Sequence, residues 1–588
     1  MRSRSPSVQH MSQPPGPVHA PVSDRDRMVI YLAILMALFL AALDQTIVAT
    51  ALPRIVEDLQ GVDRYAWVAT AYLLASTSLA LVYGKLADTY PRRHVTLGAV
   101  FLFLGGSTLC GLAGELGRIP LLGDGMSQLV LFRGIQGAGG GGLFAMTFIV
   151  IADLFTPAER GRYQGLVGAV FGVASVLGPV IGGLLTDYAG GLVPGIEGWR
   201  WVFYVNLPIG GFALYFILRR MPRLEPHGNP GRPDLVSGVL LLLGLVPLIL
   251  SLQLDKRRHP WLPWLGGAAE PGVEAWLTPI SFVTGLAVLG LFVRRNRASR
   301  SPILDFVLFR NDVFRLANVT SFFIGASFMA VSIFLPLFLV YVLGVSATRA
   351  GAALIPFSLG IVVSATLAGQ IVNRVGYRWQ IFLGGLLFLA SLVLLATMGS
   401  DVPYSRVTAY MVLAGLGVGP GMPLFTLAVQ NAVPVRFIGQ ATSAAQFFRQ
   451  MGATVGAALM GAVLGSTLGA AFATIDLPPE VLATPDTSIE ELVSSGGADL
   501  PERIRSVYEE RAAAAPGPAA AATLREEGER RADEIGAEVR GAFSLATARI
   551  YRLAALIVVV ALVMTLRIPE LPLRTTHDRL EAARAGPE

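Results

Sequence analysis

Long apolar stretches alternate with short polar loops along almost the whole chain. Fourteen of them approach or exceed the roughly 20 residues that a helix needs to cross a bilayer. They lie near 29–52, 65–86, 94–113, 127–152, 162–187, 200–219, 235–254, 277–293, 314–343, 350–371, 379–398, 406–430, 440–468 and 547–567. The first runs well past the apolar region of a signal peptide and lacks a small-residue cleavage pattern, so it is interpreted as a span. The pattern predicts an all-α polytopic membrane protein with 14 transmembrane helices.

The basic residues in the short loops predict the orientation, because cytoplasmic loops carry an excess of Lys and Arg. With the N-terminus inside, the inner loops hold most of the arginines, whereas the outer loops mostly hold one or two. The exception is "DKRRH" at 255–259, which falls outside. We therefore expect a multi-pass protein of the cell membrane with both termini in the cytoplasm.

Several short phrases occur twice, once in each half of the chain. "GKLADTYPRR" (84–93) is echoed by "GQIVNRVGYR" (369–378), and "GVASVLGPVIGG" (172–183) by "FFRQMGATVGAALMG" (447–461). Such weak repetition is typical of transporters built from two homologous bundles with a substrate path between them. Two six-helix halves plus an inserted central pair account for fourteen spans.

This organisation predicts six regions. They are a disordered cytoplasmic tail (1–28), an N-terminal bundle (29–219), a linker with two inserted spans (220–300), a C-terminal bundle (301–469 and 547–568), an external loop (470–546) and a second cytoplasmic tail (569–588). The loop carries fifteen Asp or Glu against seven Arg, and two helix-like stretches flank a "PGP" break. We expect a helical hairpin there, available to an extracytoplasmic protein partner; the alternative is a solvated linker.

Composition narrows the function classes. Of the 588 residues, 53% are hydrophobic and 15% charged, against about 25% charged in soluble proteins. The net charge of +6 comes from arginines in short loops, so it does not indicate nucleic-acid binding. No phosphate-binding loop ends in Lys-Ser or Lys-Thr, and neither the six histidines nor the single cysteine suggests a metal site. We therefore expect no cofactor, and an ion gradient as the energy source.

Two charged residues interrupt apolar spans. Asp44 lies about 24 Å along the first span and Arg133 about 10 Å from the outer end of the fourth, at a rise of about 1.5 Å per residue. The two spans run in opposite directions, so the charges could lie at similar depth. A charge inside the bilayer is a functional candidate by default. We expect these residues to couple protons or substrate; the alternatives are a polar residue near a span end for Asp44 and snorkelling for Arg133.

The loop "GKLADTYPRR" combines small and charged residues. Gly84 permits close helix approach, and Asp88 can pair with Arg92 or Arg93 or face the N-terminus of a neighbouring helix. Such a cluster could latch one conformation and release another. An ordinary topogenic basic loop is the alternative.

The echo of this loop in the second half keeps the glycine but not the carboxylate. It contains Gly369, Asn373, Arg374 and Arg378, with Asn373 in the place of the aspartate. Each half would thus carry one cytoplasmic hinge, and only the first would keep the ion pair.

In the fifth span, small residues surround a proline. The stretch contains Gly172, Gly178, Pro179, Gly182 and Gly183. Glycines allow tight helix packing, and a proline removes one backbone hydrogen bond. We expect a bend here where the two halves meet, with a structural and gating role.

Five motifs in order resemble the major facilitator superfamily, specifically its fourteen-span drug:proton antiporters of the EmrB/QacA type. They are "LDQTIVATALPRI" (43–55), "GKLADTYPRR", "LVLFRGIQGAGGG" (129–141), "GVASVLGPVIGG" and "WRWVFYVNLPIG" (199–210). The resemblance covers roughly residues 28–470 and the last span. It implies a proton or cation site at Asp44, a relay partner at Arg133, a conformational latch in the loop and an antiporter hinge in the fifth span.

The function expected from these observations is export of amphipathic or hydrophobic compounds, driven by proton influx through alternating access. We expect a cavity with one acidic site, Asp44, which suits lipophilic cargo and contact with membrane lipid. The main alternative is an exporter of lipids or glycolipids that works with an external carrier protein docked on 470–546. A membrane enzyme lacks a visible catalytic constellation, and a sensor or scaffold would tolerate the loss of Asp44.

Overall fold

The computed structural model describes residues 23–59, 65–117, 124–191, 196–226, 234–253, 274–345, 347–475, 477 and 500–573. These residues form helices and connecting turns, with no strand among them. The predicted tails therefore lie mostly outside the described residues, as does 478–499 in the predicted external loop.

The first half of the chain forms one helical bundle. Its helices are α1 (Asp24–Leu59), α2 (Tyr65–Thr89), α3 (Arg92–Gly111), α4 (Gly125–Leu154), α5 (Pro157–Tyr188), α6 (Trp201–Tyr204) and α7 (Asn206–Arg220). The chain continues into α8 (Leu235–Gln253) and α9 (Glu274–Ala298).

The second half forms the other bundle. It contains α10 (Asp312–Tyr341), α11 (Ala347–Ala352), α12 (Leu354–Val375), α13 (Tyr377–Leu395), α14 (Tyr404–Val418), α15 (Gly421–Ala432), α16 (Ile438–Phe472) and α20 (Pro518–Leu566), with α19 (Leu500–Ala513) before the last. Three predicted spans are divided between two helices in the structure: 200–219 between α6 and α7, 350–371 between α11 and α12, and 406–430 between α14 and α15.

Thirteen spans in the described part of the chain are long and apolar enough to cross a membrane. They correspond to thirteen of the fourteen predicted spans. The remaining one, 235–254, contains the shorter apolar helix Val236–Ile249 within α8. The prediction of an all-α polytopic membrane protein is confirmed.

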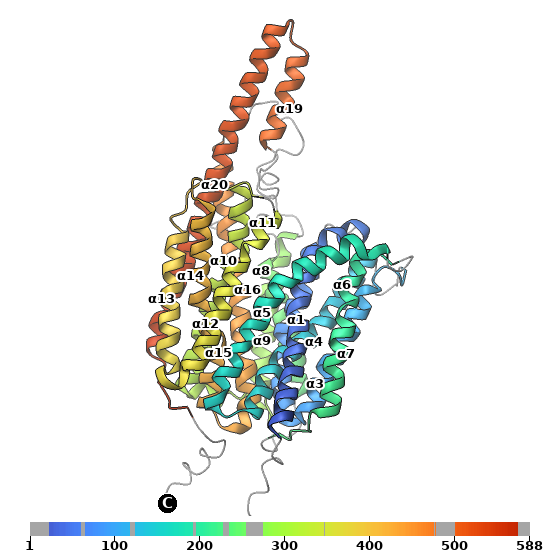
Figure 1. Ribbon diagram of the computed structural model, residues 1–588, viewed down its shortest axis with the longest axis vertical. Coiled ribbons are helices and arrows are strands. Elements are labelled where there is room, and N and C mark those ends of the chain that lie inside the picture. The colour runs from blue at the N-terminus through green and yellow to red at the C-terminus, as the bar shows by residue number, and fades with distance from the viewer. Residues whose placement is uncertain are drawn as a thin grey trace, which may run out of the picture.

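The two bundles stand side by side (Figure 1). They contact each other mainly through α5 against α12 and α2 against α16. The first residues of α1 and the end of α20 lie at the same end of the molecule, which we call the terminus side. The opposite end, from which α19 and the start of α20 project, is called the hairpin side.

Helix α4 packs unusually closely against its neighbours because it carries a run of glycines. A Cβ on Gly137 would lie 2.3 Å from the backbone oxygen of Tyr72 in α2, and one on Gly139 would lie 2.3 Å from the backbone nitrogen of Phe103 in α3. Only glycine allows backbones to approach this closely. The run thus holds α4 between α2 and α3, at the centre of the first bundle.

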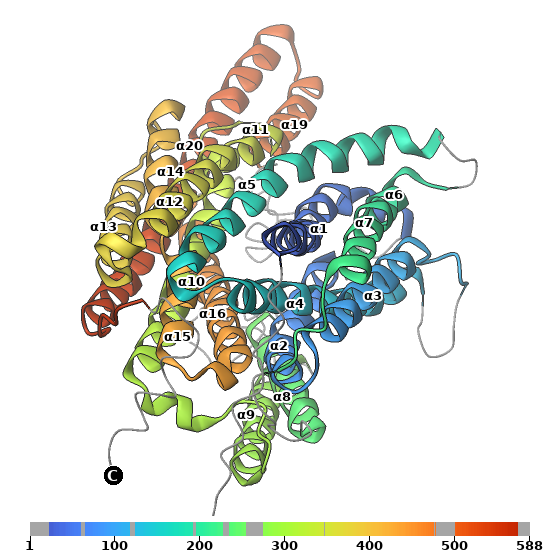
Figure 2. The same ribbon diagram turned by 60° about the horizontal axis from the view of Figure 1, so that its bottom comes forward.

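The inserted helices α8 and α9 pair with each other at one edge of the molecule, as Figure 2 shows. Helix α8 also contacts α2 and α16, one helix from each bundle. The pair therefore lies beside the α2–α16 contact and outside both bundles.

The last span and the predicted hairpin share one helix. Helix α20 runs unbroken through 49 residues, or about 73 Å at a rise of about 1.5 Å per residue. Its first part packs against α19, and both project beyond the bundles (Figure 1). The sequence predicted a hairpin followed by a separate span at 547–567. The structure joins them in one helix, because its proline stands at the first position, where proline is tolerated, and no other proline follows within it.

Candidate functional site

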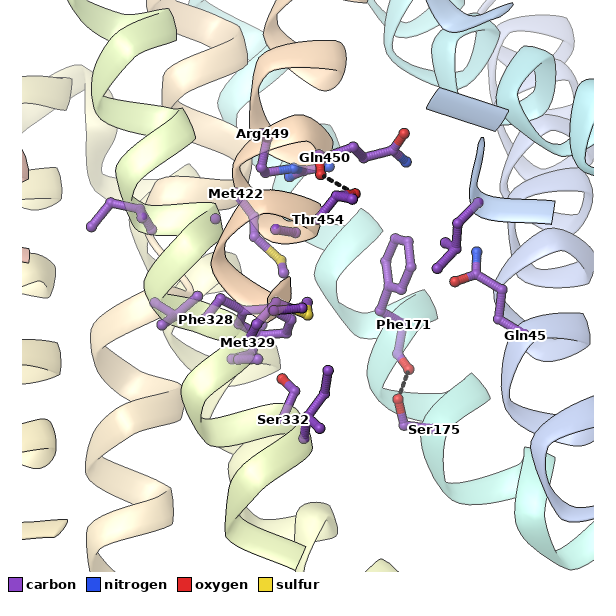
Figure 3. Close-up of a pocket in the computed structure, with 18 of the residues that line it drawn as sticks. Gln45, Phe171, Ser175, Phe328, Met329, Ser332, Met422, Arg449, Gln450 and Thr454 are labelled. Carbon is purple, nitrogen blue, oxygen red and sulfur yellow. Dashed lines mark hydrogen bonds between the residues drawn. The ribbon is translucent and has the colours of Figure 1, made fainter. Parts of the chain in front are cut away.

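A cavity of about 1160 Å³ lies between the two bundles. Its wall comes from α1, α2, α4 and α5 on one side and mainly from α10, α12, α15 and α16 on the other. Figure 3 shows Phe171 and Gln45 facing Met329, Met422 and Thr454 across this space. The cavity is mostly apolar with scattered polar groups, as is typical of sites for small molecules.

Hydrogen bonds between the bundles form the floor of the cavity. Gln164 of α5 donates its side-chain amide to the amide oxygen of Gln430 in α15 at 2.9 Å. Gln430 in turn donates to the backbone oxygen of Phe148 in α4 at 3.2 Å and to the hydroxyl of Thr442 at 2.9 Å. The bundles are therefore joined below the cavity, towards the terminus side.

The cavity extends from this floor towards the hairpin side. Its wall there includes Pro179 of α5, Leu354 at the start of α12 and Ser466 of α16, and the bundles diverge in the same direction (Figure 1). The conformation thus has its main contacts between bundles on the terminus side.

Asp88 forms the most specific of these contacts. Its carboxylate accepts backbone N–H groups of Gly439 and Gln440 at 2.9 Å each, in the first turn of α16. A carboxylate is stabilised there because unpaired N–H groups and the helix dipole both favour negative charge. Gly84 lies beside this contact, and a Cβ at that position would clash with Ser443.

The two arginines of the loop have different partners. Arg92 is fully buried and lies 2.7 Å from Asp153 at the end of α4 and 3.8 Å from Asp88. Arg93 instead donates to the backbone oxygen of Leu218 in α7 at 2.6 Å. Only Arg92 thus contacts the carboxylate that crosses between the bundles.

The echo of this loop lies at the matching place between α5 and α12. Asn373 donates to the backbone oxygen of Ala158 at 2.8 Å, and a Cβ on Gly369 would lie 2.0 Å from the backbone oxygen of Gly161. Arg374 is exposed. The backbone N–H of Arg378 donates to Glu570, which follows α20 and also accepts from the N–H of Tyr377.

Asp44 lies at the centre of a buried polar cluster inside the first bundle. It accepts hydrogen bonds from Arg133 at 2.6 Å, from Gln136 at 2.8 Å and from Asn206 at 3.0 Å. The Arg133 guanidinium also lies over the ring of Tyr72, 4.4 Å from its centroid. Asp44 is 0% exposed and Arg133 2% exposed, so each charge is compensated without water.

The expectation that Asp44 provides an acidic site in the cavity is wrong. It does not line the cavity, and the described lining residues include no carboxylate. Successive helical residues point about 100° apart; Gln45 and Thr46 line the cavity while Asp44 faces α4 and α7. The charged pair therefore lies behind the cavity wall.

The small residues of α5 face two different neighbours. Gly172 lies against Val362 of α12 in the other bundle, whereas Gly178 and Gly182 lie against Thr46 and Thr50 of α1. Nothing lies within 4 Å of a Cβ placed on Gly183. Gly172 thus packs where the halves meet, whereas Gly178 and Gly182 pack within the first bundle. The bend and the gating role of this stretch stay a prediction.

Besides Gln164 and Gln430 of the floor, four residues of the site were not singled out from the sequence. They are Asp153, which pairs with Arg92; Gln136 and Asn206, which contact Asp44; and Arg449, which lines the cavity. Gln136 could have been found from its place three residues after Arg133, on the same helix face. The described residues contain no group of three His, Cys, Asp or Glu side chains that could hold a metal ion.

Comparisons with known proteins agree with this architecture. Residues 34–457 match the Major Facilitator Superfamily. The chain is 35% identical over 432 residues to the multidrug transporter protein MdtP of Bacillus subtilis (strain 168), covering 73% of this chain and 74% of that protein. It is 31% identical to an uncharacterized MFS-type transporter of Mycobacterium tuberculosis (strain ATCC 25618 / H37Rv), covering 96% of this chain and 72% of that protein.

The fold is similar to that of a solved transporter. The proton:xylose symporter XylE aligns with a TM-score of 0.54 at 14% identity, covering 95% of this chain and 99% of that one. At this identity the similarity concerns the fold alone.

Proposed function

Because the chain belongs to the major facilitator superfamily, we propose that it is a proton-coupled antiporter that exports amphipathic or hydrophobic compounds. It is a multi-pass membrane transporter and not an enzyme. The name of its relative MdtP, a multidrug transporter protein, supports drug-like cargo.

The cavity between the bundles is the observation that carries this proposal. Its volume of about 1160 Å³ is above the usual range of about 300–1,000 Å³ for small-molecule pockets. Its wall is shared by helices of both bundles, so movement of one bundle against the other would change access to it. Alternating access of this kind is how repeat-built transporters work.

We place the terminus side in the cytoplasm. The arginines of the predicted inner loops, among them Arg93, Arg374 and Arg378, lie on that side, as the positive-inside rule expects. In this orientation the conformation is closed towards the cytoplasm, and its cavity extends outwards.

Asp44 is proposed as the proton site because its charge holds together α1, α4 and α7. Protonation would remove the attraction to Arg133 and change the hydrogen bonds from Gln136 and Asn206. Gln45 and Thr46 on the same helix line the cavity. A shift of α1 would therefore move side chains that contact a substrate bound there. Proton binding and substrate binding would then be linked through one helix.

Asp88, Arg92 and Asp153 are proposed as the latch of the closed cytoplasmic face. The carboxylate of Asp88 holds the first turn of α16, while Arg92 ties it to the end of α4. To open the cavity inwards, this contact and the Gln164–Gln430 floor must separate.

Proton-coupled efflux in everted membrane vesicles tests the proposal. Wild type, Asp44→Asn and the control Asp312→Asn, an exposed residue at the start of α10, would be compared on a panel of dyes and lipid reporters. We expect wild type and the control to move at least one dye and to dissipate the pH gradient when the dye is added, and Asp44→Asn to do neither.

Two other outcomes would change the proposal. Dye export that is unaffected by Asp44→Asn would remove Asp44 from the coupling step. Movement of lipid reporters without any dye would favour the lipid exporter, and the projecting α19–α20 hairpin would then be tested as the docking site of a carrier protein.

A further inference from the structure

One charged side chain stands in the wall of the cavity. Among the described lining residues, Arg449 of α16 is the only Asp, Glu, Lys or Arg. It lies eleven residues after the first residue of the helix, Ile438, or about 17 Å from the terminus-side end of α16 at about 1.5 Å per residue. This places a cation near the middle of a bilayer whose hydrocarbon core is about 30 Å thick.

Arg449 lacks the kind of partner that Arg133 has inside the first bundle. Arg133 contacts the carboxylate of Asp44 at 2.6 Å. Arg449, by contrast, donates to the neutral amide oxygen of Gln446, and no described carboxylate lies within ion-pair distance of it. A charge at this depth is stable only when it is paired or hydrated. Because no described carboxylate pairs with Arg449, its positive charge is left for water or a ligand in the cavity to balance.

The surroundings of Arg449 add polar donors but no negative charge. Gln446, whose amide oxygen accepts from Arg449, is buried and does not line the cavity. Gln450 accepts from Thr77 of α2 at 2.9 Å, and Thr454 donates to the backbone oxygen of Gln450 (Figure 3). The amide oxygen of Gln450 is thus already paired, and its side-chain N–H groups remain, beside Arg449, as donors for a ligand.

The remainder of the cavity is suited to an apolar body. Phe328 and Met329 of α10 and Met422 of α15 lie on the side of Arg449, with Phe171 of α5 opposite (Figure 3). Aromatic rings and flexible thioethers adapt to hydrophobic ligands of varied shape. A ligand that fills this space would keep an apolar part against these side chains and a charged part near Arg449.

We propose that the cavity selects amphipathic anions, in which a carboxylate, sulfonate or phosphate is attached to an apolar body. The anionic group binds the Arg449 guanidinium, whose planar donors suit such oxygens. A lipophilic cation would be repelled by the same group, with no cavity carboxylate to offset the repulsion. The inference rests on the proposed export function for its biological meaning, but binding itself does not depend on proton coupling.

The test is equilibrium binding to the full chain in nanodiscs of zwitterionic lipid. Three probes share one apolar body and differ in charge: 4-(1-pyrenyl)butyric acid, its neutral amide and 4-(1-pyrenyl)butylamine. We expect the acid to bind wild type at least tenfold more tightly than the amine. Empty nanodiscs measure the partitioning of each probe into lipid.

Variants identify the residue responsible. Arg449→Gln is expected to weaken the acid at least tenfold and to leave the amide within about twofold, whereas Arg449→Lys keeps part of the preference for the acid. The control is Arg406→Gln, an exposed arginine at the start of α14, which should change nothing. Size-exclusion profiles establish that each variant is folded.

A second arm distinguishes a lipid headgroup from a soluble acid. Phosphatidylglycerol is added to the nanodiscs, and displacement of the pyrene acid in wild type but not in Arg449→Gln would show that the lipid phosphate occupies the same site. The proposal is overturned if the acid and the amine bind equally, if Arg449→Gln weakens all three probes alike, or if neither the acid nor phosphatidylglycerol binds. Loss of dye export with intact acid binding would instead count only against the export function.

Discussion

The carboxylate of Asp88 and the backbone N–H of Gln440 are 352 residues apart in the chain and 2.9 Å apart in space. The first ends a helix of one bundle, and the second begins a helix of the other. The Asp88 carboxylate is thus one of the hydrogen-bonded groups that join the two halves where the cavity is closed.

Asp88→Asn should weaken this closure. Negative charge at a helix N-terminus contributes about 0.3–1 kcal/mol, and up to about 2 kcal/mol when partly buried. Loss of about 1–2 kcal/mol would shift the ratio of closed to open terminus-side states about five- to thirtyfold. Double electron–electron resonance between spin labels placed at Tyr90 and Arg436, both exposed on this side, should show an additional population at longer distance in the variant. An unchanged distance distribution would contradict a latch, and Asp312→Asn is the matched surface control.

Asp44→Asn and Arg133→Gln should each destabilise the protein more than both together. Removing one member of a buried ion pair leaves an uncompensated charge and costs about 3–5 kcal/mol, whereas replacing both removes the charge altogether. Thermal unfolding in detergent should therefore show a lowered melting temperature for each single variant. The melting temperature of the double variant should lie between those of the single variants and wild type. Proton-coupled export should be lost in both single variants and in the double variant. Additive losses of stability would show that the pair does not act as a unit.

Two glycines of α5 should respond differently to alanine. A Cβ on Gly178 would lie 2.0 Å from the hydroxyl oxygen of Thr46, while one on Gly183 meets nothing within 4 Å. Overpacking costs about 1–3 kcal/mol, so Gly178→Ala should lower both melting temperature and export. Gly183→Ala should leave both unchanged. Equal sensitivity of the two variants would mean that the stretch acts through backbone flexibility and not through packing on α1.

The hairpin should loosen in acid. In the described hairpin Glu509 of α19 contacts Arg525 of α20 at 2.9 Å, and this hydrogen-bonded arginine lowers the pKa of Glu509 below its ordinary 4.5. A lowered pKa in the folded state means that the contact stabilises the hairpin above about pH 4.5 and is lost as the pH falls below that value. Amide hydrogen exchange in α19 should therefore accelerate, after correction for intrinsic rates, between pH 6 and pH 3.5.

Matched variants assign this acid response. Glu509→Gln should exchange faster already at pH 6 and show a smaller change on acidification. Glu510→Gln, one residue further along the same helix, should behave like wild type. If Glu509→Gln kept the full response, other carboxylates of the hairpin would be responsible.

Much of the fold was predictable because membrane spans are local properties of the sequence. Each needs about 20 apolar residues whatever its neighbours are, so thirteen of the fourteen predicted spans appear in the described chain as helical segments long and apolar enough to cross a membrane. The pairing of Asp44 with Arg133 was also accessible, since a charge in the bilayer requires a partner and few charges are available. Arg449 was not singled out, because its stretch, "FFRQMGATVG", entered only as the echo of the fifth-span stretch.

The sequence by itself determined where the long apolar spans lie, that short phrases recur in the two halves, and that Asp44 and Arg133 bring charge into the bilayer. Only the tertiary structure decided which side of α1 faces the cavity, which carboxylate holds α16, and that an arginine and not an aspartate stands in the cavity wall. The physical reason is that hydropathy depends on residues next to one another in the chain. Contacts such as Asp88–Gln440 and Asp44–Asn206 depend on how whole helices rotate and approach, and that is settled by packing across the bundle.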